Sequence, residues 1–324
     1  MAYADMRILW LATDRSKRVA NIFGPLQKEV SKIADVHFIL RQLPLGMLPK
    51  AWQQKYTKGN EKPPRLVNPK FANEFDFIIV DAPFAFLDEN WEKIKTKKGV
   101  LIEDQHGDVL EYSKRYMDEG FDIFFTRYNN ILKQHPWLKD QTIKWLPHGF
   151  DPNIFKDYKS FKKWDCLMVG RIQPKIYPIR WKVHQQMSNS SAAYNRTERP
   201  EENVPEQLRW PIHKEYAQMI GYSKITFACM SIFKYPVMKY FEIPACNSAL
   251  FADYNDELDE LGFKPDENMV SLNGVDNIPE LVKSWLGSPK ELSNLSGNGY
   301  DMVHEKHTAE KRAEQLINYI EAEL

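Results

Sequence analysis

Short apolar runs alternate with helical patterns along the first half of the chain. Between the first two runs, Val19, Ile22, Phe23, Leu26, Val30 and Ile33 recur at steps of three and four, which predicts a helix with one apolar face. The runs themselves cover residues 7–13, 36–40, 77–81, 99–103, 122–126 and 142–146. Continuous apolar runs are typical of parallel strands that helices cover on both faces. The pattern therefore predicts an α/β fold with a doubly wound parallel sheet.

A second series of apolar runs predicts another sheet of the same kind, with strands at residues 165–170, 224–230, 249–253 and 268–272. Residues 185–210 are polar and contain two prolines, so we expect a long surface connection there. The last helix has the clearest pattern. Thr308 is placed to cap it, and its apolar face is formed by Ala309, Ala313, Leu316, Ile317 and Ile320.

The break between the two halves falls within residues 147–163, where Pro147, Gly149 and Pro152 precede a lysine-rich passage. A chain of 324 residues is longer than one compact core usually becomes. We therefore expect two Rossmann-like domains, the first over residues 1–150 and the second from residue 151. Such sheets bind ligands at the carboxyl ends of their strands, so the expected site is the cleft between the domains.

Charge and cysteine content exclude several classes of protein. Lys+Arg and Asp+Glu both number 44, so the formal net charge is zero, which argues against a globally basic nucleic-acid coat but not against a local basic patch. The three cysteines include no C-x-x-C pair, which argues against a disulfide framework and a zinc knuckle. Since the apolar run at residues 8–12 is too short for a signal segment, we expect a soluble, cytoplasmic protein. The chain lacks G-x-G-x-x-G, a P-loop and G-x-S-x-G, so nicotinamide binding, P-loop chemistry and a serine-hydrolase elbow are disfavoured.

Residues 169–175 read VGRIQPK, a strand that ends in glycine and is followed by cations. Backbone N–H groups at such a strand end, together with Arg171 and Lys175, suit a diphosphate. The alternative is a surface turn with two solvated cations.

Residues 233–247 read FKYPVMKYFEIPACN, a turn at Pro236 followed by a helix from about Val237 that carries Lys239 and Glu242. A carboxylate one turn inside this helix is suited to accept hydrogen bonds from both hydroxyls of a ribose. The alternative is that Glu242 is a solvated helix residue.

Two further segments carry candidate chemistry. Residues 103–108 directly follow a buried strand. His106 in this segment is suited to bind a sugar hydroxyl or to transfer a proton, with Asp104 beside it. The alternative is a turn in which Asp104 caps the next helix. Residues 41–70 are basic, with aromatic residues between the lysines. We expect this segment to be an acceptor loop or to contact an anionic membrane surface. The candidate contacts within it are Lys50, Trp52, Lys55 and Tyr56. A solvated loop is the alternative.

His148, in the rigid crossing at residues 145–155, is expected to be structural.

Four motifs occur in one order: LPHGFDPNIF, VGRIQPK, KYFEIPACNSALFAD and HTAEKRAEQLINYI. In this order they resemble the group-1 glycosyltransferases of the GT-B fold, in the subgroup similar to spore-maturation glycosyltransferases. The resemblance covers about residues 120–322. It implies two Rossmann-like domains that face each other across a cleft, with a nucleotide-sugar domain at residues 151–307. It also implies that a C-terminal helix, about residues 308–324, crosses back to brace the first domain.

The resemblance also implies roles for individual residues. Arg171 and Lys175 match the diphosphate-contacting pair, and Glu242 matches the second glutamate of the E-x7-E motif, which binds the ribose. The first glutamate of that motif is replaced by Lys234, which leaves the sugar and the retaining outcome open and makes Lys234 a candidate catalytic residue beside His106 and Asp104. The donor diphosphate is also expected to contact Tyr235, Val237, Met238 and Lys239, with the backbone around residues 235–238 facing the leaving group.

The implied activity is transfer of a sugar, of the hexosyltransferase type, from a nucleotide-diphosphate sugar to an acceptor. The expected donor is a UDP-sugar, and neither a cofactor nor a metal is expected. A glycan, a lipid-linked group, a small molecule or a polymer remains open as the acceptor, and the oligomeric state is undetermined. A sugar-nucleotide epimerase of the same fold and a non-catalytic nucleotide-sugar-binding protein are the alternatives.

Overall fold

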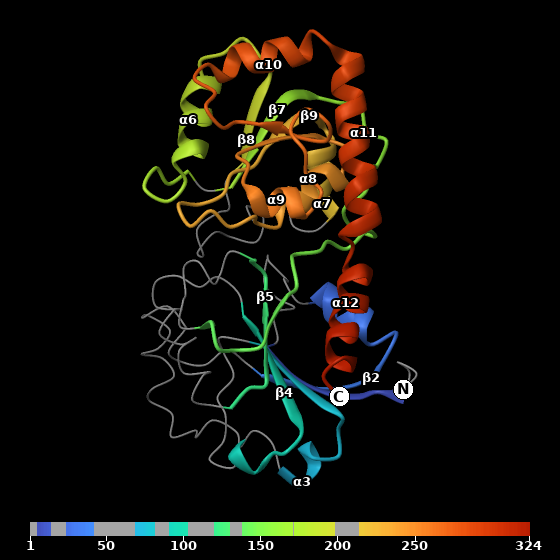
Figure 1. The fold of residues 1–324 in the computed structure, drawn as a ribbon. Coiled ribbons are helices and arrows are strands. Elements are labelled where there is room, and N and C mark those ends of the chain that lie inside the picture. Colours follow the sequence, from blue (N-terminus) through green and yellow to red (C-terminus); the bar gives the residue numbers. More distant parts are fainter. Residues whose placement is uncertain are drawn as a thin grey trace, which may run out of the picture. The chain divides into compact units, whose positions relative to one another are not determined.

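The computed structural model describes residues 5–13, 24–41, 69–81, 91–102, 120–129, 138–170, 172–197 and 214–324. Contacts within the chain divide it into two compact units. The first is Met1–Pro147 together with Arg312–Leu324, and the second is His148–Lys311. Each unit is built around one parallel sheet, as Figure 1 shows.

The sheet of the first unit has the strand order β2-β1-β3-β4-β5-β6, and every pairing is parallel. Its strands are β1 Arg7–Thr13, β2 Asp35–Arg41, β3 Phe77–Asp81, β4 Lys97–Ile102, β5 Ile123–Thr126 and β6 Ile143–Trp145. Its helical elements are α1 Gly24–Val30, α3 Pro69–Ala72, the short 3₁₀ helix η3 Trp91–Lys93 and α12 Ala309–Glu321. All six strands that the apolar runs predict in this half are present, with ends that shift by up to two residues.

Both faces of this sheet are buried. Successive residues of β1 contribute to opposite cores, with Ile8 and Trp10 on one face and Leu9 and Leu11 on the other. This two-sided burial explains why the strands are continuous apolar runs. β4 begins earlier than its apolar run because Lys98 is buried and its Nζ donates to the carbonyl oxygen of Ile94 at 3.0 Å.

Helix α12 packs into the core of the first unit (Figure 1). Ala313, Leu316, Ile317 and Ile320 pack with Ile8 and Trp10 of β1 in one apolar cluster. Thr308 caps the helix, since its Oγ1 accepts a hydrogen bond from the N–H of Lys311 at 3.3 Å. The cap and the apolar face predicted for this helix are both confirmed.

The sheet of the second unit has the order β11-β10-β9-β7-β8, again with parallel pairing throughout. Its strands are β7 Trp164–Val169, β8 Tyr194–Thr197, β9 Ser223–Phe227, β10 Ala249–Ala252 and β11 Val270–Ser271. Its helices are α6 Pro178–Met187, α7 Lys214–Gly221, α8 Lys239–Ala245, α9 Asp256–Glu260, α10 Ile278–Leu286 and α11 Pro289–Lys306. The chain order reverses between β7 and β9, and this is the switch point at which such sheets bind ligands.

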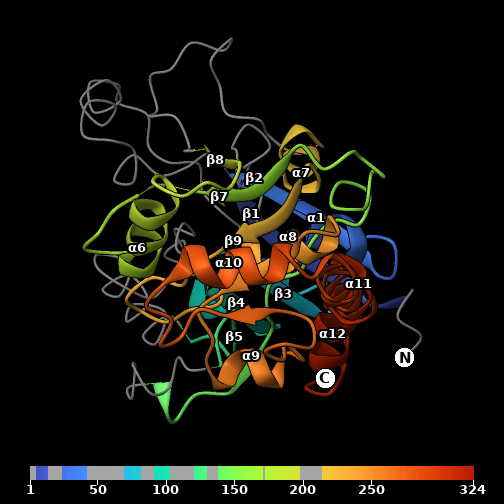
Figure 2. The same cartoon turned by 90° about the horizontal axis from the view of Figure 1, so that it is seen from above.

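Helices α6 and α10 lie side by side, as the view in Figure 2 shows, and share a core with the sheet through Val183, Met187, Ile278 and Val282. Helices α11 and α8 also pack together. Gly299 permits this approach, because a β-carbon there would lie 2.8 Å from the carbonyl oxygen of Asn268 and 3.3 Å from Cβ of Pro244.

The expectation of a long surface connection at residues 185–210 is wrong in its first part. Helix α6 continues to Met187, and β8 at Tyr194–Thr197 pairs with β7. The strand is polar because it lies at the edge of the sheet, so no apolar run marks it.

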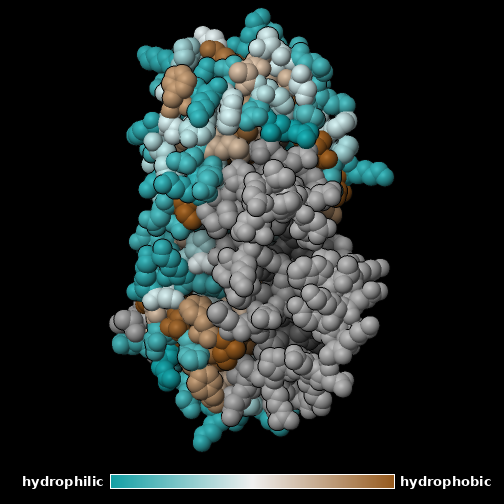
Figure 3. Space-filling model, turned by 180° about the vertical axis from the view of Figure 1, so that it is seen from behind, coloured by the Kyte–Doolittle hydropathy of each residue, from teal (hydrophilic) through white to brown (hydrophobic). Residues whose placement is uncertain are grey.

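The surface of the second unit is mainly hydrophilic on the face that Figure 3 shows. Over the described residues, no helix combines the length and the apolar character needed to cross a bilayer.

Candidate functional site

The turn after β7 brings two cationic side chains to the switch point of the second sheet. Gly170 has a φ of +106°, a conformation that favours glycine. A β-carbon at Gly170 would lie 3.1 Å from Nη1 of Arg180 and 3.5 Å from Cε of Lys239. The absence of a side chain at Gly170 therefore lets Arg180 of α6 and Lys239 of α8 meet at one strand end.

Arg180 is buried, with 3% of its surface exposed. It lies in the first turn of α6, whose start is set by a proline at the first helical position. Its guanidinium lies 3.9 Å from the ring centroid of Tyr177, and its Nη2 donates to the carbonyl oxygen of Cys229 at 3.5 Å. Arg180 was not among the residues predicted from the sequence, although its place in the first turn of α6 after the glycine turn is a usable signal.

Glu242 of α8 is buried, so the alternative of a solvated helix residue is wrong. Burial raises the pKa of Glu242 to about 7, and the positive charge of Lys239 and a hydrogen bond from the hydroxyl of Tyr216 limit the rise. Burial likewise raises the pKa of Tyr216, on α7, well above its usual value. Tyr216 was not predicted, because it comes from a separate helix and only the fold brings it to Glu242.

One buried carboxylate holds both ends of the segment that joins β9 to α8. Oδ1 of Asp253 accepts hydrogen bonds from the N–H of Met230 at 2.8 Å and from the hydroxyl of Tyr240 at 2.7 Å. Asp253 follows β10 directly, and 2% of its surface is exposed. Its position fixes the path of residues 230–240, which contain most of the predicted diphosphate contacts.

Within this segment the predicted contacts differ in exposure. Tyr235 is buried, and its ring stacks on Phe233 with a centroid distance of 6.3 Å, so its side chain belongs to the packing of the loop. Val237 and Met238 are half-buried, and the carbonyl oxygen of Met238 accepts from the N–H of Glu242 at 3.0 Å. Lys239 lies beside Gly170 and Glu242.

Lys234 and Lys175 have exposed side chains. Lys175 lies in the turn after β7, where the carbonyl oxygen of Gln173 accepts from the N–H of Tyr177 at 2.7 Å. Lys234 adopts a left-handed backbone with a φ of 60°, and its Nζ lies 3.8 Å from Oδ2 of Asp253. The two lysines occupy different turns at the carboxyl edge of the sheet.

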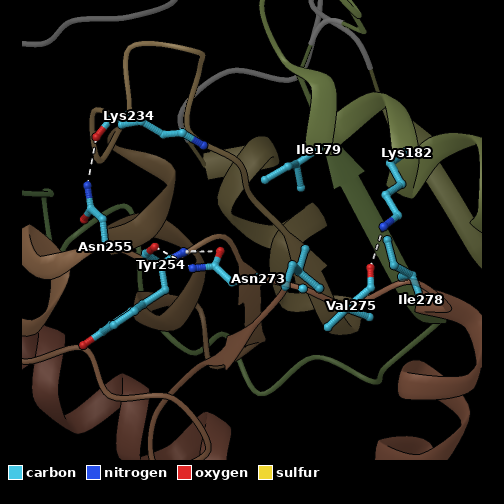
Figure 4. Close-up of a pocket in the computed structure, with 10 residues that line it drawn as sticks. Ile179, Lys182, Lys234, Tyr254, Asn255, Asn273, Val275 and Ile278 are labelled. Carbon is cyan, nitrogen blue, oxygen red and sulfur yellow. Dashed lines mark hydrogen bonds between the residues drawn. The ribbon is translucent and has the colours of Figure 1, made fainter.

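A pocket of about 520 Å³ adjoins Lys234 at this edge (Figure 4). It is formed by the start of α6, the turns after β10 and β11, and the start of α10. Its lining residues are Ile179, Lys182, Lys234, Tyr254, Asn255, Leu272, Asn273, Gly274, Val275 and Ile278. Among the predicted site residues that the structure describes, only Lys234 lines this pocket.

Several candidates lie outside the described residues. These are Arg171, the pair Asp104 and His106, and the acceptor-loop residues Lys50, Trp52, Lys55 and Tyr56. His148 is described and is buried.

The three cysteines, Cys166, Cys229 and Cys246, are free and buried. Burial raises the pKa of both Cys166 and Cys229 to about 12 and that of Cys246 well above its usual value. Such thiols are poor nucleophiles. Within the part of the chain that the structure describes, no group of three or more His, Cys, Asp and Glu side chains is placed to hold a metal ion.

Comparison with known proteins finds one family model that matches part of the chain and many solved structures of similar fold. Residues 162–318 match the family model described as glycosyl transferase-like. No curated protein sequence matches the chain. The family match covers most of the second unit, which contains the turn after β7, and ends within α12.

Solved structures resemble the chain over nearly its full length. The Anabaena protein HepE, in complex with UDP and glucose, has a TM-score of 0.66 at 10% identity and covers 98% of this chain and 100% of its own. Sucrose-phosphate synthase from Thermosynechococcus elongatus has a TM-score of 0.62 at 12% identity and covers 98% of both chains. A glycosyltransferase from Rickettsia africae has a TM-score of 0.59 at 13% identity and covers 99% of both chains.

At these identities the likeness establishes the fold. The α/β class with two parallel sheets is confirmed, and the spore-maturation subgroup stays a prediction. The chain has the fold of the GT-B glycosyltransferases, and residues 162–318 match the glycosyl transferase-like family.

Proposed function

We propose that the chain is a glycosyltransferase of the hexosyltransferase type that binds a nucleoside-diphosphate sugar, with a UDP-sugar as the donor, at the carboxyl edge of the second sheet. The observation that carries the proposal is the meeting of Arg180 and Lys239 at Gly170, next to the buried carboxylate of Glu242. Two cations and one carboxylate at a switch point suit a diphosphate followed by a ribose. HepE, which shares the fold, is described in complex with UDP-glucose.

Each of these side chains has a role that follows from its charge. Departure of the nucleoside diphosphate places negative charge on the leaving phosphate, and Arg180, Lys239 and the predicted pair Arg171 and Lys175 are suited to stabilise it. Glu242 accepts hydrogen bonds from the ribose hydroxyls in its ionised form. With this positive charge supplied by side chains, we propose a transfer that does not depend on a metal and that proceeds with retention.

The first domain is proposed to select the acceptor, with His106 and Asp104 as proton-transfer candidates and residues 41–70 as the acceptor loop. Lys234 stands where the family places its first glutamate. The donor sugar therefore meets a cation in this protein.

A titration of the purified chain with nucleotides tests the proposal. UDP, GDP, dTDP, CMP, ADP and NAD are added separately to wild type, Glu242→Gln and Lys264→Gln, and the melting temperature and heat of binding are measured. A ligand at 100 times its Kd adds about 2.7 kcal/mol to the free energy of unfolding. We expect UDP to raise the melting temperature of the wild type and of the Lys264→Gln control. In Glu242→Gln the Kd of UDP should be at least about tenfold higher than in the wild type.

Binding of NAD alone, or of none of the nucleotides, overturns the donor-site assignment. Once the nucleotide is known, incubation with the corresponding sugar donor separates the three activities. A transferase releases the nucleoside diphosphate faster when its acceptor is added. An epimerase converts the donor without an acceptor, and a binding protein leaves the donor intact.

A further inference from the structure

Lys234 is held in an unfavourable backbone conformation by two hydrogen bonds. Its N–H donates to the carbonyl oxygen of Ser231 at 3.0 Å, and its own carbonyl oxygen accepts from Nδ2 of Asn255 at 3.0 Å. A left-handed φ costs a residue with a β-carbon on the order of 1 kcal/mol, so the surrounding contacts impose this conformation. The result is a lysine whose side chain leaves the loop in a defined direction. Figure 4 shows it extending from the side of Asn255 toward Ile179.

The ammonium of Lys234 is directed by a buried carboxylate. Both hydrogen bonds that Asp253 accepts from Met230 N–H and the Tyr240 hydroxyl fall on Oδ1. Oδ2 is buried and accepts no hydrogen bond from the described residues, and Nζ of Lys234 lies 3.8 Å from it. At this distance the interaction is an ion pair, so the donor hydrogens of the ammonium remain available to a ligand.

Other polar side chains of the pocket in Figure 4 are already engaged with the protein. Asn255 accepts from Leu258 N–H with its Oδ1, in addition to its bond to Lys234. Asn273 donates to the carbonyl oxygen of Tyr254 at 2.8 Å and accepts from its N–H at 3.2 Å. Nζ of Lys182 donates to the carbonyl oxygen of Val275 at 2.6 Å. Nζ of Lys182 also lies 3.3 Å from Oδ1 of Asp276. These bonds shape the pocket wall, and Lys234 is the more exposed of the two lysines that line it, 59% against 40%.

The remaining lining of the pocket is apolar. Ile179, Leu272, Val275 and Ile278 contribute hydrocarbon surface, and none of the described lining residues carries a carboxylate. A ligand that fits such a pocket has a compact body with C–H faces and a negative charge at one side. A sugar that bears a carboxylate or a phosphate meets both conditions.

We propose that this pocket is a subsite for an anionic sugar, in which Lys234 contacts the negative group and Asp253 is the positioning residue that holds the ammonium of Lys234. The anionic sugar has two possible sources. If it is the sugar of the donor, the inference rests on the proposed function. A phosphorylated sugar acceptor carries the same kind of negative group, and the experiment separates these two sources.

The test compares ligands that differ only in charge. Calorimetric titrations measure the Kd of UDP, UDP-glucose and UDP-glucuronate, and, in the presence of saturating UDP, of glucose and glucose 6-phosphate. The variants are Lys234→Gln, Lys234→Arg and Asp253→Asn. Lys264→Gln is the matched control, because Lys264 is 55% exposed and forms a 3.7 Å ion pair, against 59% and 3.8 Å for Lys234.

We expect UDP to bind wild type, Lys234→Gln and Lys264→Gln equally. Wild type and the control should bind the anionic member of one sugar pair about fivefold to tenfold more tightly than the neutral member. Lys234→Gln should remove this preference and Lys234→Arg should keep most of it. Asp253→Asn should lower the preference for the anionic sugar, and a cooperative melting curve shows that this variant is folded.

A preference confined to UDP-glucuronate identifies the donor sugar as the anionic group, and one confined to glucose 6-phosphate identifies an acceptor. The proposal is overturned if wild type shows no charge preference in either pair, or if the preference survives Lys234→Gln. If UDP does not bind the wild type, the proposed donor site is contradicted. In that case the Kd values of glucose and glucose 6-phosphate are measured without UDP. Tighter binding of glucose 6-phosphate that depends on Lys234 supports the anionic subsite, and the absence of this preference overturns it.

Discussion

The guanidinium of Arg180 occupies the space that a side chain at residue 170 would need. Nη1 of Arg180 lies 3.1 Å from the position of a β-carbon on Gly170, which is closer than almost all real contacts of that kind. Gly170 thus has a conformational reason to be glycine, its φ of +106°, and a steric one. The same geometry thus accounts for the glycine in the turn and for the position of the Arg180 guanidinium.

Replacement of Gly170 by alanine should displace Arg180. We expect the free energy of unfolding to fall by about 1–3 kcal/mol, because of the backbone conformation, and the Kd of UDP to rise about tenfold. Thermal melts and calorimetric titration measure the two effects. Gly120→Ala is the matched control, because Gly120 also has a positive φ, of 69°, but has no atom within 4 Å of the added carbon. Unchanged UDP affinity in Gly170→Ala would show that Arg180 is not a phosphate contact.

Donor binding should depend on pH through Glu242. Because the pKa of this buried carboxyl is raised to about 7, it is mostly ionised at pH 8 and mostly protonated at pH 6. Ribose hydroxyls favour the ionised acceptor, so the affinity for UDP should fall about tenfold between pH 8 and pH 6. Titrations of Glu242→Gln isolate any pH dependence of UDP itself, and an equal fall in this variant would contradict the assignment.

The same pKa has the opposite consequence for folding. A carboxyl whose pKa is higher in the folded than in the unfolded state binds its proton more tightly when folded. Its contribution to stability is complete below the ordinary carboxyl pKa of 4.5 and is lost as the pH rises through about 7. The free energy of unfolding of the wild type should therefore fall across this window relative to Glu242→Gln, by on the order of 3 kcal/mol. Denaturant titrations at pH 5 and pH 8 measure the difference.

The hydroxyl of Tyr216 tunes this titration. Its hydrogen bond lowers the pKa of Glu242 against the effect of burial, so Tyr216→Phe should raise that pKa further. We expect the pH midpoint of UDP binding to move upward by about half a unit to one unit. A Tyr216→Phe variant with a lower affinity but an unmoved midpoint would assign Tyr216 a packing role only.

Helix α12 should be essential to the stability of the first unit. Leu316 is fully buried in the cluster that contains Trp10 of β1. Leu316→Ala should lower the free energy of unfolding by about 2–5 kcal/mol, because it leaves a cavity in that core. Asn318→Ala, an exposed position on the same helix, should change it by less than about 0.5 kcal/mol. Equal effects of the two variants in denaturant titrations would mean that α12 does not belong to this core.

The three cysteine thiols should not react with thiol reagents in the native protein. Cys166, Cys229 and Cys246 are buried, and burial raises their pKa values, so few thiolates form at neutral pH. A thiol reagent such as 5,5′-dithiobis(2-nitrobenzoic acid) should titrate them only after denaturation. Rapid reaction of one thiol in the native state would show that its surroundings open.

Local pattern and tertiary contact contributed differently to the site. Glu242, Lys239 and Lys234 were recognised in the sequence because they stand in a short motif around a helix start. Tyr216 and Asp253 were not, since each comes from a different element and nothing in its local sequence marks it. Arg180 was not recognised either, although its place in the first turn of α6 is a local signal. A hydrogen bond such as that from Tyr216 to Glu242 joins residues far apart in the chain, and no periodicity records it.

The sequence by itself determined the two parallel sheets and the last helix. Burial on both faces forces a parallel strand such as β3 to be apolar throughout, and the cap at Thr308 and the apolar face of α12 are local signals. Only the tertiary structure decided the polar edge strand β8, the meeting of Arg180 with Lys239 at Gly170, and the direction in which Asp253 holds Lys234. These features depend on packing between distant segments, where the stabilising partner of a residue is chosen by the fold and not by its neighbours in the chain.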